Sequence, residues 1–326
     1  MATKRALPAL VRSQFTAAQE TGDLTFYPTQ VSVLSCNGFP FQLRYSPALA
    51  NKPKSNKPKD SKPVDPFENP SKALFVTALS DSHYLVLNKF PVIRDHFILA
   101  TKDFKEQTDL LEEGDIGAAY SCLKAYRDEG EELFGFFNSG EHSGASQPHR
   151  HIQFLPVESM RSGVSEGVTW NVLADSLADN QDGKVLPFSY FVSALPDGAT
   201  PRQLHEIYAQ LYENTFRAAR EFSKSPGTSF SLPEATRKAE SRISYNMGLT
   251  DRVMVLCPRV FEGQKVKSNE GEIIGPIALN GTILGGTLLV KSEDEWQALR
   301  DDESKLRSIL ANIGIPSTKA DPDERL

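Results

Sequence analysis

An alternation of polar and apolar residues directly after a small-residue loop is the feature that most constrains this chain. Residues 148–156 read PHRHIQFLP, and they follow the loop 138–147, NSGEHSGASQ. Successive side chains of a β-strand point to opposite faces, so His149, His151 and Gln153 would share one face. We therefore expect a strand, a glycine-bearing loop and a second strand, with two imidazoles and a carboxamide on one wall of a site.

Those residue types suit chemistry at phosphorus. A neutral imidazole can attack phosphorus and leave again, and its ordinary pKa of about 6.5 keeps a lone pair free at neutral pH. His151 is the expected nucleophile, with its far ring nitrogen donating to a backbone carbonyl of the preceding loop. His149 is expected to assist orientation. Gln153 offers an N–H group to a phosphoryl oxygen and has no titratable proton, which favours holding a nucleotidylated histidine for an incoming anion over rapid hydrolysis.

The loop before the histidines is a candidate anion site. Small side chains allow an anion to approach the backbone N–H groups closely. The residues concerned are Gly144, Ala145, Ser146 and Gln147.

These motifs resemble a known superfamily. Residues 144–153, GASQPHRHIQ, are similar to the histidine-triad superfamily and especially to its transferase branch, where glutamine replaces the third histidine. The loop resembles that of the fungal ATP adenylyltransferases, also called diadenosine tetraphosphate (Ap4A) phosphorylases. Residues 87–91 with 95–99 are similar to the nucleotide-binding strand, turn and strand, and residues 279–291 to the C-terminal substrate segment. The resemblance therefore covers nearly the whole chain.

The resemblance implies a fold and an activity. The expected fold is α+β and histidine-triad-like, a single 1–326 domain with a mostly antiparallel sheet flanked by helices and a mobile Lys/Pro loop near 51–66. The expected reaction is phosphorolysis of Ap4A to ATP and ADP, and its reverse, through a covalent adenylyl group on His151. AMP is then the transferred group and inorganic phosphate its acceptor.

The resemblance also implies further substrate contacts. They are Lys52, Asn88, Lys89, Asn138, Asn280, Gly281, Thr282, Thr287 and Lys291. Lys54 is an alternative to Lys52, and an asparagine that only shapes a turn is an alternative for Asn88. Thr287 stands where the family often has a bulkier residue. We interpret His83 and His96, at predicted strand ends, as structural.

Composition limits the class of protein. Hydrophobic residues make up 39% and charged residues 24% of the chain, as in soluble globular proteins, and no apolar run approaches the roughly 20 residues that span a bilayer. Three widely spaced cysteines fit a reducing compartment, and a net charge of −6 disfavours general nucleic-acid binding. We expect a cytoplasmic monomer without membrane or nucleic-acid partners; the Lys/Pro run allows a nuclear import signal as an alternative.

Other functions fit parts of the pattern. Two alternate histidines on a strand are half of a zinc site, for which only His142 or Glu141 could supply a third ligand. A sugar-1-phosphate uridylyltransferase shares the His-x-His-x-Gln core but often has cysteine pairs that this chain lacks. A non-catalytic dinucleotide-binding module would need the loop but not the nucleophile. We expect no cofactor built into the protein, with magnesium arriving on the substrate polyphosphate.

Sequence patterns also predict helices and strands between the motifs. We predict strands at 31–34, 39–45, 75–79, 83–87 and 97–100, and a hairpin of 243–249 with 252–257. A helix is predicted to follow a cap at Thr101 and run to residue 113, and another to begin at Asp115. Further helices are predicted over 16–27, from Pro201, and from Ser292 to about Gly314.

Overall fold

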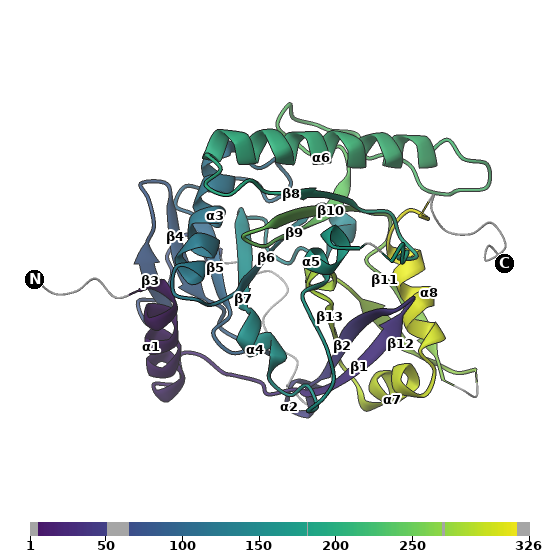
Figure 1. Cartoon of the computed structure of the whole chain (residues 1–326), viewed down its shortest axis with the longest axis horizontal. Coiled ribbons are helices and arrows are strands. Elements are labelled where there is room, and N and C mark those ends of the chain that lie inside the picture. Colours follow the sequence, from purple (N-terminus) through teal and green to yellow (C-terminus); the bar gives the residue numbers. More distant parts are fainter. Residues whose placement is uncertain (1–5, 51–64, 181, 269–270, 318–326) are drawn as a thin grey trace, which may run out of the picture.

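An eight-stranded antiparallel sheet forms the centre of the molecule (Figure 1). The computed structural model describes residues 6–50, 65–180, 182–268 and 271–317. The strands, in their order across the sheet, are β3 (Phe75–Ala78), β4 (His83–Leu87), β5 (Phe97–Thr101), β7 (His151–Pro156), β6 (Leu133–Ser139), β9 (Ser244–Leu249), β10 (Val253–Arg259) and β8 (Phe191–Ala194). The central position of β7, between β5 and β6, places the histidine motif in the middle of the sheet.

Three helices cover one face of this sheet, and Figure 1 shows them along one side and the top of the molecule. They are α1 (Leu7–Glu20), α3 (Glu113–Arg127) and α6 (Pro201–Phe222). α6 begins with a reciprocal cap between Thr200 and Gln203 and with Pro201 in its first turn. Ile152 and Phe154 of β7 belong to the core under these helices, which leaves the opposite face of β7 for the polar residues.

A second layer packs against the opposite face. Its small sheet contains β1 (Gln30–Cys36), β2 (Phe39–Tyr45) and β13 (Thr287–Val290), with β13 parallel to β2. The other elements are α2 (Pro47–Ala50), η1 (Glu141–Ser143), α4 (Val157–Arg161), α5 (Leu173–Ala178), β11 (Gly263–Lys267), β12 (Ile273–Ala278), η2 (Gly281–Gly285), α7 (Glu293–Asp301) and α8 (Ser304–Ile313).

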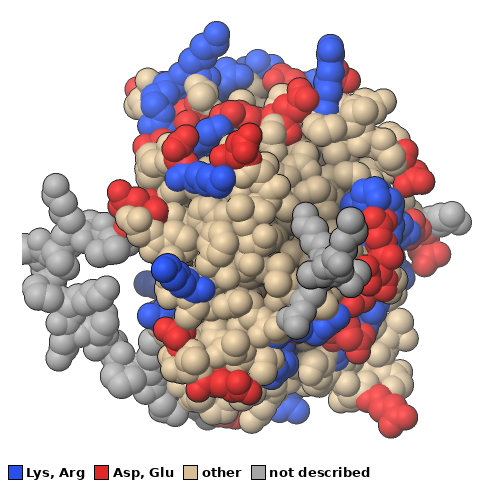
Figure 2. All heavy atoms as spheres, turned by 90° about the vertical axis from the view of Figure 1, so that its left-hand side faces the viewer, with Lys and Arg blue, Asp and Glu red and all other residues tan. Residues whose placement is uncertain are grey.

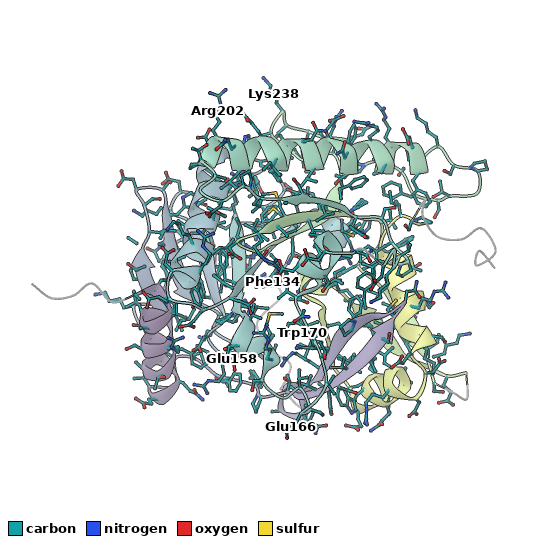
Figure 3. All side chains as sticks on the ribbon, in the orientation of Figure 1. Phe134, Glu158, Glu166, Trp170, Arg202 and Lys238 are labelled. Carbon is teal, nitrogen blue, oxygen red and sulfur yellow. The ribbon has the colours of Figure 1, made fainter. Side chains whose placement is uncertain are left out.

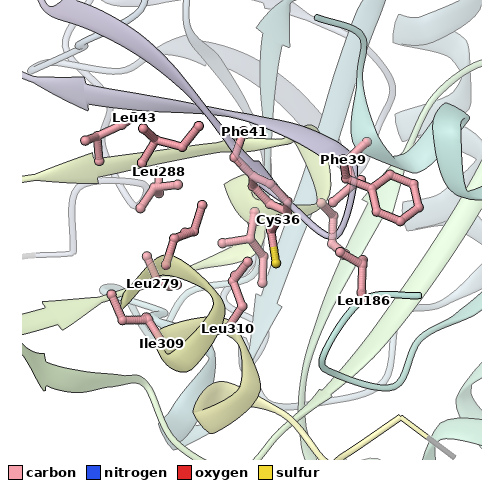
Figure 4. Close-up of a cluster of buried hydrophobic side chains, with 14 of the residues drawn as sticks. Cys36, Phe39, Phe41, Leu43, Leu186, Leu279, Leu288, Ile309 and Leu310 are labelled. Carbon is pink, nitrogen blue, oxygen red and sulfur yellow. The ribbon is translucent and has the colours of Figure 1, made fainter. Parts of the chain in front are cut away.

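The core between the two layers is built from aliphatic and aromatic side chains. Figure 4 shows Phe41 of β2, Leu288 of β13 and Leu310 of α8 converging in this cluster. Phe134 of β6 and Trp170 belong to the same cluster and lie in the interior (Figure 3). The predicted α+β class, with a mostly antiparallel sheet flanked by helices, is confirmed.

Some predicted elements are different in the structure. Residues 102–112 form no regular helix, because Thr101 ends β5 and its hydroxyl donates to the carbonyl of Asp103. The first helix ends at Glu20, and the closing helix is interrupted at Asp302, whose extended backbone separates α7 from α8. The strands predicted at 75–79, 83–87 and 97–100 are confirmed to within one residue.

The surface has no dominant sign of charge on the face that carries α1, β3 and β4. In Figure 2, basic and acidic side chains are interspersed around a broad uncharged area. Within the described part of the chain, no helix is both long and apolar enough to cross a membrane.

Candidate active site

His151 lies at the start of β7 with its ring orientation fixed. Its Nδ1 donates to the carbonyl oxygen of His149 at 2.8 Å, so the lone pair is on Nε2, which has no hydrogen-bond partner among the described residues. The side chain is 4% exposed. Burial lowers the pKa of His151 from its ordinary value near 6.5 to about 4. At neutral pH the ring is therefore a neutral base with one available nitrogen. We expected the acceptor carbonyl in the loop 138–147, whereas the acceptor is His149, two residues before the nucleophile.

Gln107 fixes the backbone of the same residue. Its Oε1 accepts from His151 N at 2.8 Å, and its Nε2 donates to the carbonyls of Asn138 and His151 at 2.7 and 3.2 Å. The ladder between β6 and β7 has its last pair at Phe136 and Gln153, so this carboxamide takes the place of strand pairing where the strands separate. The sequence analysis missed Gln107, because nothing local marks a glutamine in an irregular segment.

Both ring nitrogens of His149 contact other residues of the protein. Nδ1 donates to Asp65 Oδ2 at 2.7 Å, and Nε2 lies 2.9 Å from the carbonyl oxygen of Thr101. It is therefore the His149 carbonyl, and not the imidazole, that orients His151. Phe67 packs against both rings, with centroid distances of 5.7 Å to His149 and 5.0 Å to His151. Both histidines consequently face the side of the sheet opposite the three helices.

Gln153 belongs to a chain of hydrogen bonds that decides which way its amide faces. Phe90 N donates to Asn88 Oδ1 at 2.9 Å, which turns Asn88 Nδ2 towards His96 Nδ1 at 3.2 Å. Because Nδ2 can only donate, the His96 proton is on Nε2, 3.1 Å from Gln153 Oε1. The Nε2 amide group of Gln153 is then the one left to donate to a substrate.

His96, which we interpreted as structural, contacts Asn88 and Gln153 and lines a cavity of about 340 Å³, which we call the central cavity. Burial lowers its pKa to about 4, so the ring is neutral at pH 7 and suits this relay. His83 does have a structural role, since its Nε2 pairs with the buried Asp115 of α3 at 2.9 Å. Asn88 shapes the turn by accepting from Phe90 N, and it also lines the central cavity.

The loop before β7 depends on glycine. Gly144 has a φ of 77°, and a Cβ atom there would lie 2.7 Å from Asn280 Cβ and 2.9 Å from the Leu279 carbonyl oxygen. The loop thus rests directly on the segment before η2. The N–H of Ala145 lies 3.3 Å from Ser143 Oγ, whereas the N–H groups of Gly144, Ser146 and Gln147 donate to no described residue. Such free N–H groups are what an anion site needs.

Asn138 anchors these segments to one another. Its Oδ1 accepts from Asn246 Nδ2 at 2.9 Å and from Gly281 N at 2.8 Å. Asn246 also donates to the carbonyl of Ser143, and Arg259 donates to Asn246 Oδ1. Asn138 is 2% exposed. We expected a substrate contact at this position, and the structure gives its side-chain oxygen a role in holding η2 against the sheet.

Gln153 lines the central cavity, whereas His149 and His151 are not among its lining residues. The predicted residues that line it are Asn88, Gly144, Gln153, Asn280, Thr282 and Lys291. His96 and Glu262, which the sequence analysis did not propose as contacts, also line it. Residues far apart in sequence are therefore brought to one hollow on the face of the sheet that carries His151.

Other predicted contacts lie elsewhere. Thr287 is 2% exposed in β13 and is not among the lining residues, and neither is the buried Gly281, whose N–H is already bound to Asn138. Lys89 is exposed beside the lining residue Phe90, with its Nζ 5.7 Å from that ring. Lys52 and its alternative Lys54 lie outside the described residues.

Residues 145–147 lie at the surface next to Gly144. Ala145 and Ser146 are exposed, and Gln147 is half-buried.

A metal site is not apparent in the described part of the chain. No group of three or more His, Cys, Asp and Glu side chains there could hold a metal ion. Asp65 and Thr101 engage the ring nitrogens of His149, and Nδ1 of His151 is engaged by a carbonyl. The arrangement favours nucleophilic chemistry by one imidazole nitrogen, next to amide donors placed to bind phosphoryl oxygens.

Comparison with known proteins assigns the family. The model of the Ap4A phosphorylase N-terminal domain matches residues 1–169, and that of the ATP adenylyltransferase C-terminal domain matches residues 184–316. The chain belongs to the Ap4A phosphorylase family. The predicted resemblance is thereby confirmed.

Relatives within the Ap4A phosphorylase family match over almost the full length. Diadenosine 5',5'''-P1,P4-tetraphosphate phosphorylase 2 of Saccharomyces cerevisiae is 31% identical over 94% of this chain and 94% of its own length. The crystal structure of yeast Ap4A phosphorylase Apa2 superposes with a TM-score of 0.76 at 26% identity, covering 97% of this chain and 99% of that one. The Apa2 structure in complex with Ap4A gives a TM-score of 0.73 at 24% identity, with coverages of 97% and 99%.

Proposed function

We propose that this protein is a nucleotidyltransferase that phosphorolyses Ap4A to ATP and ADP and catalyses the reverse reaction. Membership of the Ap4A phosphorylase family and the likeness to yeast phosphorylase 2 support the assignment. The observation that carries the chemistry is the fixed tautomer of His151, with Nδ1 bound to a carbonyl and Nε2 unpaired among the described residues.

The first step is attack of His151 Nε2 on the α-phosphorus of Ap4A. A P–N bond forms, the bond between that phosphorus and its bridging oxygen breaks, and ATP leaves with the bond's electron pair. The imidazole acquires positive charge, which the His149 carbonyl stabilises at Nδ1–H. The remaining proton stays on Nδ1, so no general base is needed to activate the nucleophile.

The second step transfers AMP to inorganic phosphate. A phosphate oxygen attacks the α-phosphorus, the P–N bond breaks with its electron pair returning to Nε2, and ADP leaves. Gln153 Nε2 and the free N–H groups of Gly144, Ser146 and Gln147 are the proposed donors to the non-bridging oxygens, each worth about 3 kcal/mol in the transition state. Gln153 carries no acidic proton, so it does not assist hydrolysis of the adduct.

Other features of the reaction are also proposals. Magnesium would arrive with the polyphosphate, for which the described part of the chain offers no cluster of carboxylates. Lys52, or its alternative Lys54, would contact substrate phosphates; both lie outside the described residues. We infer that the protein is a cytoplasmic monomer without nucleic-acid partners, and the three free cysteine thiols support a reducing compartment. Sedimentation of the purified chain and imaging of a tagged copy test these points.

Intact-protein mass spectrometry tests the covalent step. Incubation with Ap4A without phosphate should add one adenylyl group, mapped to His151, and phosphate should then release ADP. The variant His151→Ala should form no adduct, while His205→Ala, on α6, should behave as the unmodified protein. If unmodified protein turned over Ap4A rapidly and never carried the adduct, direct displacement would replace the covalent route. A dinucleotide sensor would bind Ap4A equally well with Ala at position 151 and convert none of it.

A further inference from the structure

Arg150 lies between the two histidines of the motif and has no part in the chemistry described above. Its side chain is on the opposite face from those of His149 and His151, because successive residues of a strand alternate. On that face it is followed by Ile152 and Phe154, which belong to the core under the helices. Arg150 is 3% exposed. A charge buried at the start of an apolar face calls for a reason, because taking a guanidinium out of water costs free energy.

The guanidinium of Arg150 is held by carboxylates from one short segment. Nη1 donates to Asp115 Oδ2 at 2.7 Å and to Glu112 Oε1 at 3.1 Å. Asp109 Oδ2 lies 3.9 Å from Nη2. Nε lies 3.5 Å from the carbonyl oxygen of Glu106. We call the contacts of Arg150 with Glu112 and Asp115 the arginine clamp.

The far side of the arginine clamp is a fixed point of the fold. Asp115 is 2% exposed and lies in the first turn of α3. Its Oδ1 lies 2.9 Å from His83 Nε2, and its Oδ2 also accepts from Glu112 N at 2.8 Å, which caps the helix. The carboxylate therefore cannot follow Arg150 if the strand shifts.

The backbone of residues 148–150 is held less firmly than the rest of the strand. The ladder between β6 and β7 ends before this segment. A single antiparallel bridge joins His149 to Glu106. Arg150 N donates to the carbonyl of Lys105 at 2.8 Å. So short a pairing specifies register weakly, whereas a buried ion pair fits only one register.

This backbone carries the group that orients the nucleophile. The carbonyl of His149 accepts from His151 Nδ1 at 2.8 Å. That carbonyl and the N–H of Arg150 belong to the same peptide unit, which is planar. The carbonyl therefore cannot turn unless the backbone of Arg150 turns with it.

We propose that Arg150 is a positioning residue for the nucleophile, with the arginine clamp holding the peptide whose carbonyl keeps the proton of His151 on Nδ1. The inference rests on the proposed function, which needs the lone pair on Nε2. Without the clamp the carbonyl turns away, and the proton is free to move to Nε2. Arginine suits this role because Nε, Nη1 and Nη2 reach several acceptors at once, whereas lysine is a single point charge.

Three substitutions test the proposal. Arg150→Met keeps a long side chain and removes the charge, and Arg150→Lys keeps the charge without the planar group. Arg127→Met is the matched control. Arg127 is also an arginine paired with a carboxylate, since its Nη1 lies 3.1 Å from Asp197 Oδ1 at the end of α3.

NMR of protein with isotope-labelled histidine reads the tautomer directly. The signals of His151 are assigned by their loss in His151→Ala. In the unmodified protein and in Arg127→Met, Nδ1 should carry the proton and Nε2 should not. In Arg150→Met the proton should be shared between the two nitrogens, with a smaller change in Arg150→Lys. A role in folding alone would lower stability in urea without altering the tautomer of the folded protein.

Steady-state kinetics should show the same order. Arg150→Met should lower kcat for Ap4A at least about tenfold and change KM less than about twofold, because the nucleophile and not the binding surface is disturbed. Arg150→Lys should recover part of the loss. If the variants of Arg150 kept both kcat and the tautomer of the unmodified protein, the proposal would be wrong. Should Arg150→Met fail to fold, Arg150→Lys decides by the same two measurements.

The two measurements also separate this inference from the proposed function. The NMR spectrum needs no substrate. Absence of the adenylyl adduct in the unmodified protein would overturn the covalent mechanism and leave the spectrum unaffected. Normal adduct formation, together with an unchanged His151 tautomer in Arg150→Met and Arg150→Lys, would overturn the role of Arg150 alone.

Discussion

His96 Nε2 lies 3.1 Å from Gln153 Oε1, and this contact leaves the NH2 group of Gln153 without His96 as a partner. The two residues are 57 positions apart and meet because β5 pairs with β7. Ile98 faces Gln153 across that pairing, so His96, two residues earlier, lies at the end of the same side of β5. The orientation of one amide is thus set by a neutral histidine and the asparagine behind it.

Replacing His96 should reduce turnover more than binding. In His96→Ala the Gln153 amide loses its fixed orientation, and we expect kcat to fall at least about tenfold with KM for Ap4A little changed. His96→Gln supplies both an acceptor and a donor and should recover part of the loss. Steady-state kinetics check this, with His205→Ala as control. An unchanged kcat in His96→Ala would show that Gln153 needs no orienting partner.

Gln107 should be essential for stability as well as activity. Gln107→Leu has a similar shape but leaves buried backbone groups of His151 and Asn138 without their partner, a cost of about 3 kcal/mol in the free energy of unfolding. Urea denaturation measures this cost. Gln210→Leu, whose side chain contacts only Asn214 on the exposed face of α6, should cost far less. Equal effects of the two substitutions would remove Gln107 from the support of the nucleophile.

Gly144 and Gly227 form a matched pair for testing the loop. Both have positive φ, at 77° and 81°, but an added Cβ would collide with Asn280 and Leu279 only at Gly144. Each alanine variant should lose about 1 kcal/mol of stability from its backbone conformation. Only Gly144→Ala should also displace the free N–H groups and lower kcat/KM for Ap4A. If Gly227→Ala reduced activity as strongly, a general loss of folding would explain both.

The low pKa values of His151 and His96 predict an unusual pH profile. Burial lowers the pKa of each ring to about 4, so both rings stay neutral well below the pH at which an ordinary imidazole takes up a proton. The rate of adduct formation, followed by rapid quenching, should stay flat from pH 8 to about pH 5 and fall near pH 4. A fall centred near pH 6.5 would show that the nucleophile is open to water.

The same shifts affect the stability of the fold, and the direction is fixed by linkage. Between about pH 6.5 and pH 4 the unfolded chain binds protons at these histidines and the folded chain does not, so the free energy of unfolding falls as the pH drops. The full contribution is present above pH 6.5. His96→Gln should make the dependence shallower in denaturation curves recorded at pH 7 and pH 5. If the free energy of unfolding of His96→Gln changed with pH as much as that of the unmodified protein, the pKa of His96 would be the same in the folded and unfolded chain.

Local pattern was sufficient to predict much of the fold. Strand alternation located β7 and placed Ile152 and Phe154 on the helix side, and a proline after a threonine located the start of α6. The helix predicted after a cap at Thr101 is wrong, because a threonine before a polar run occurs at the end of a strand as well as at the start of a helix. That the chain is one domain with a mobile Lys/Pro loop stays a prediction, since residues 51–64 lie outside the described residues.

The position of a site residue was predictable only where the residue belongs to a single local motif. His151 and Gln153 lie two apart on one strand, so the period of the strand was enough. The contacts with Gln107, His96 and Phe67 depend on strand register and on a segment from elsewhere in the chain, which no local pattern encodes. Thr287 was inferred from the resemblance, and the structure buries it in β13. Roles in binding substrate stay predictions for every residue named.

The bridge that Gln107 makes between β6 and β7 has a consequence for how this chain can vary. The segment 102–112 has no repeating hydrogen-bond pattern of its own, and such segments usually accept insertions and deletions readily. Here, removing a single residue before Gln107 would withdraw the carboxamide from between the strands and leave the nucleophile's peptide unsupported. We therefore expect the length of the segment 102–112 to be constrained as tightly as the lengths of β6 and β7, which Gln107 joins.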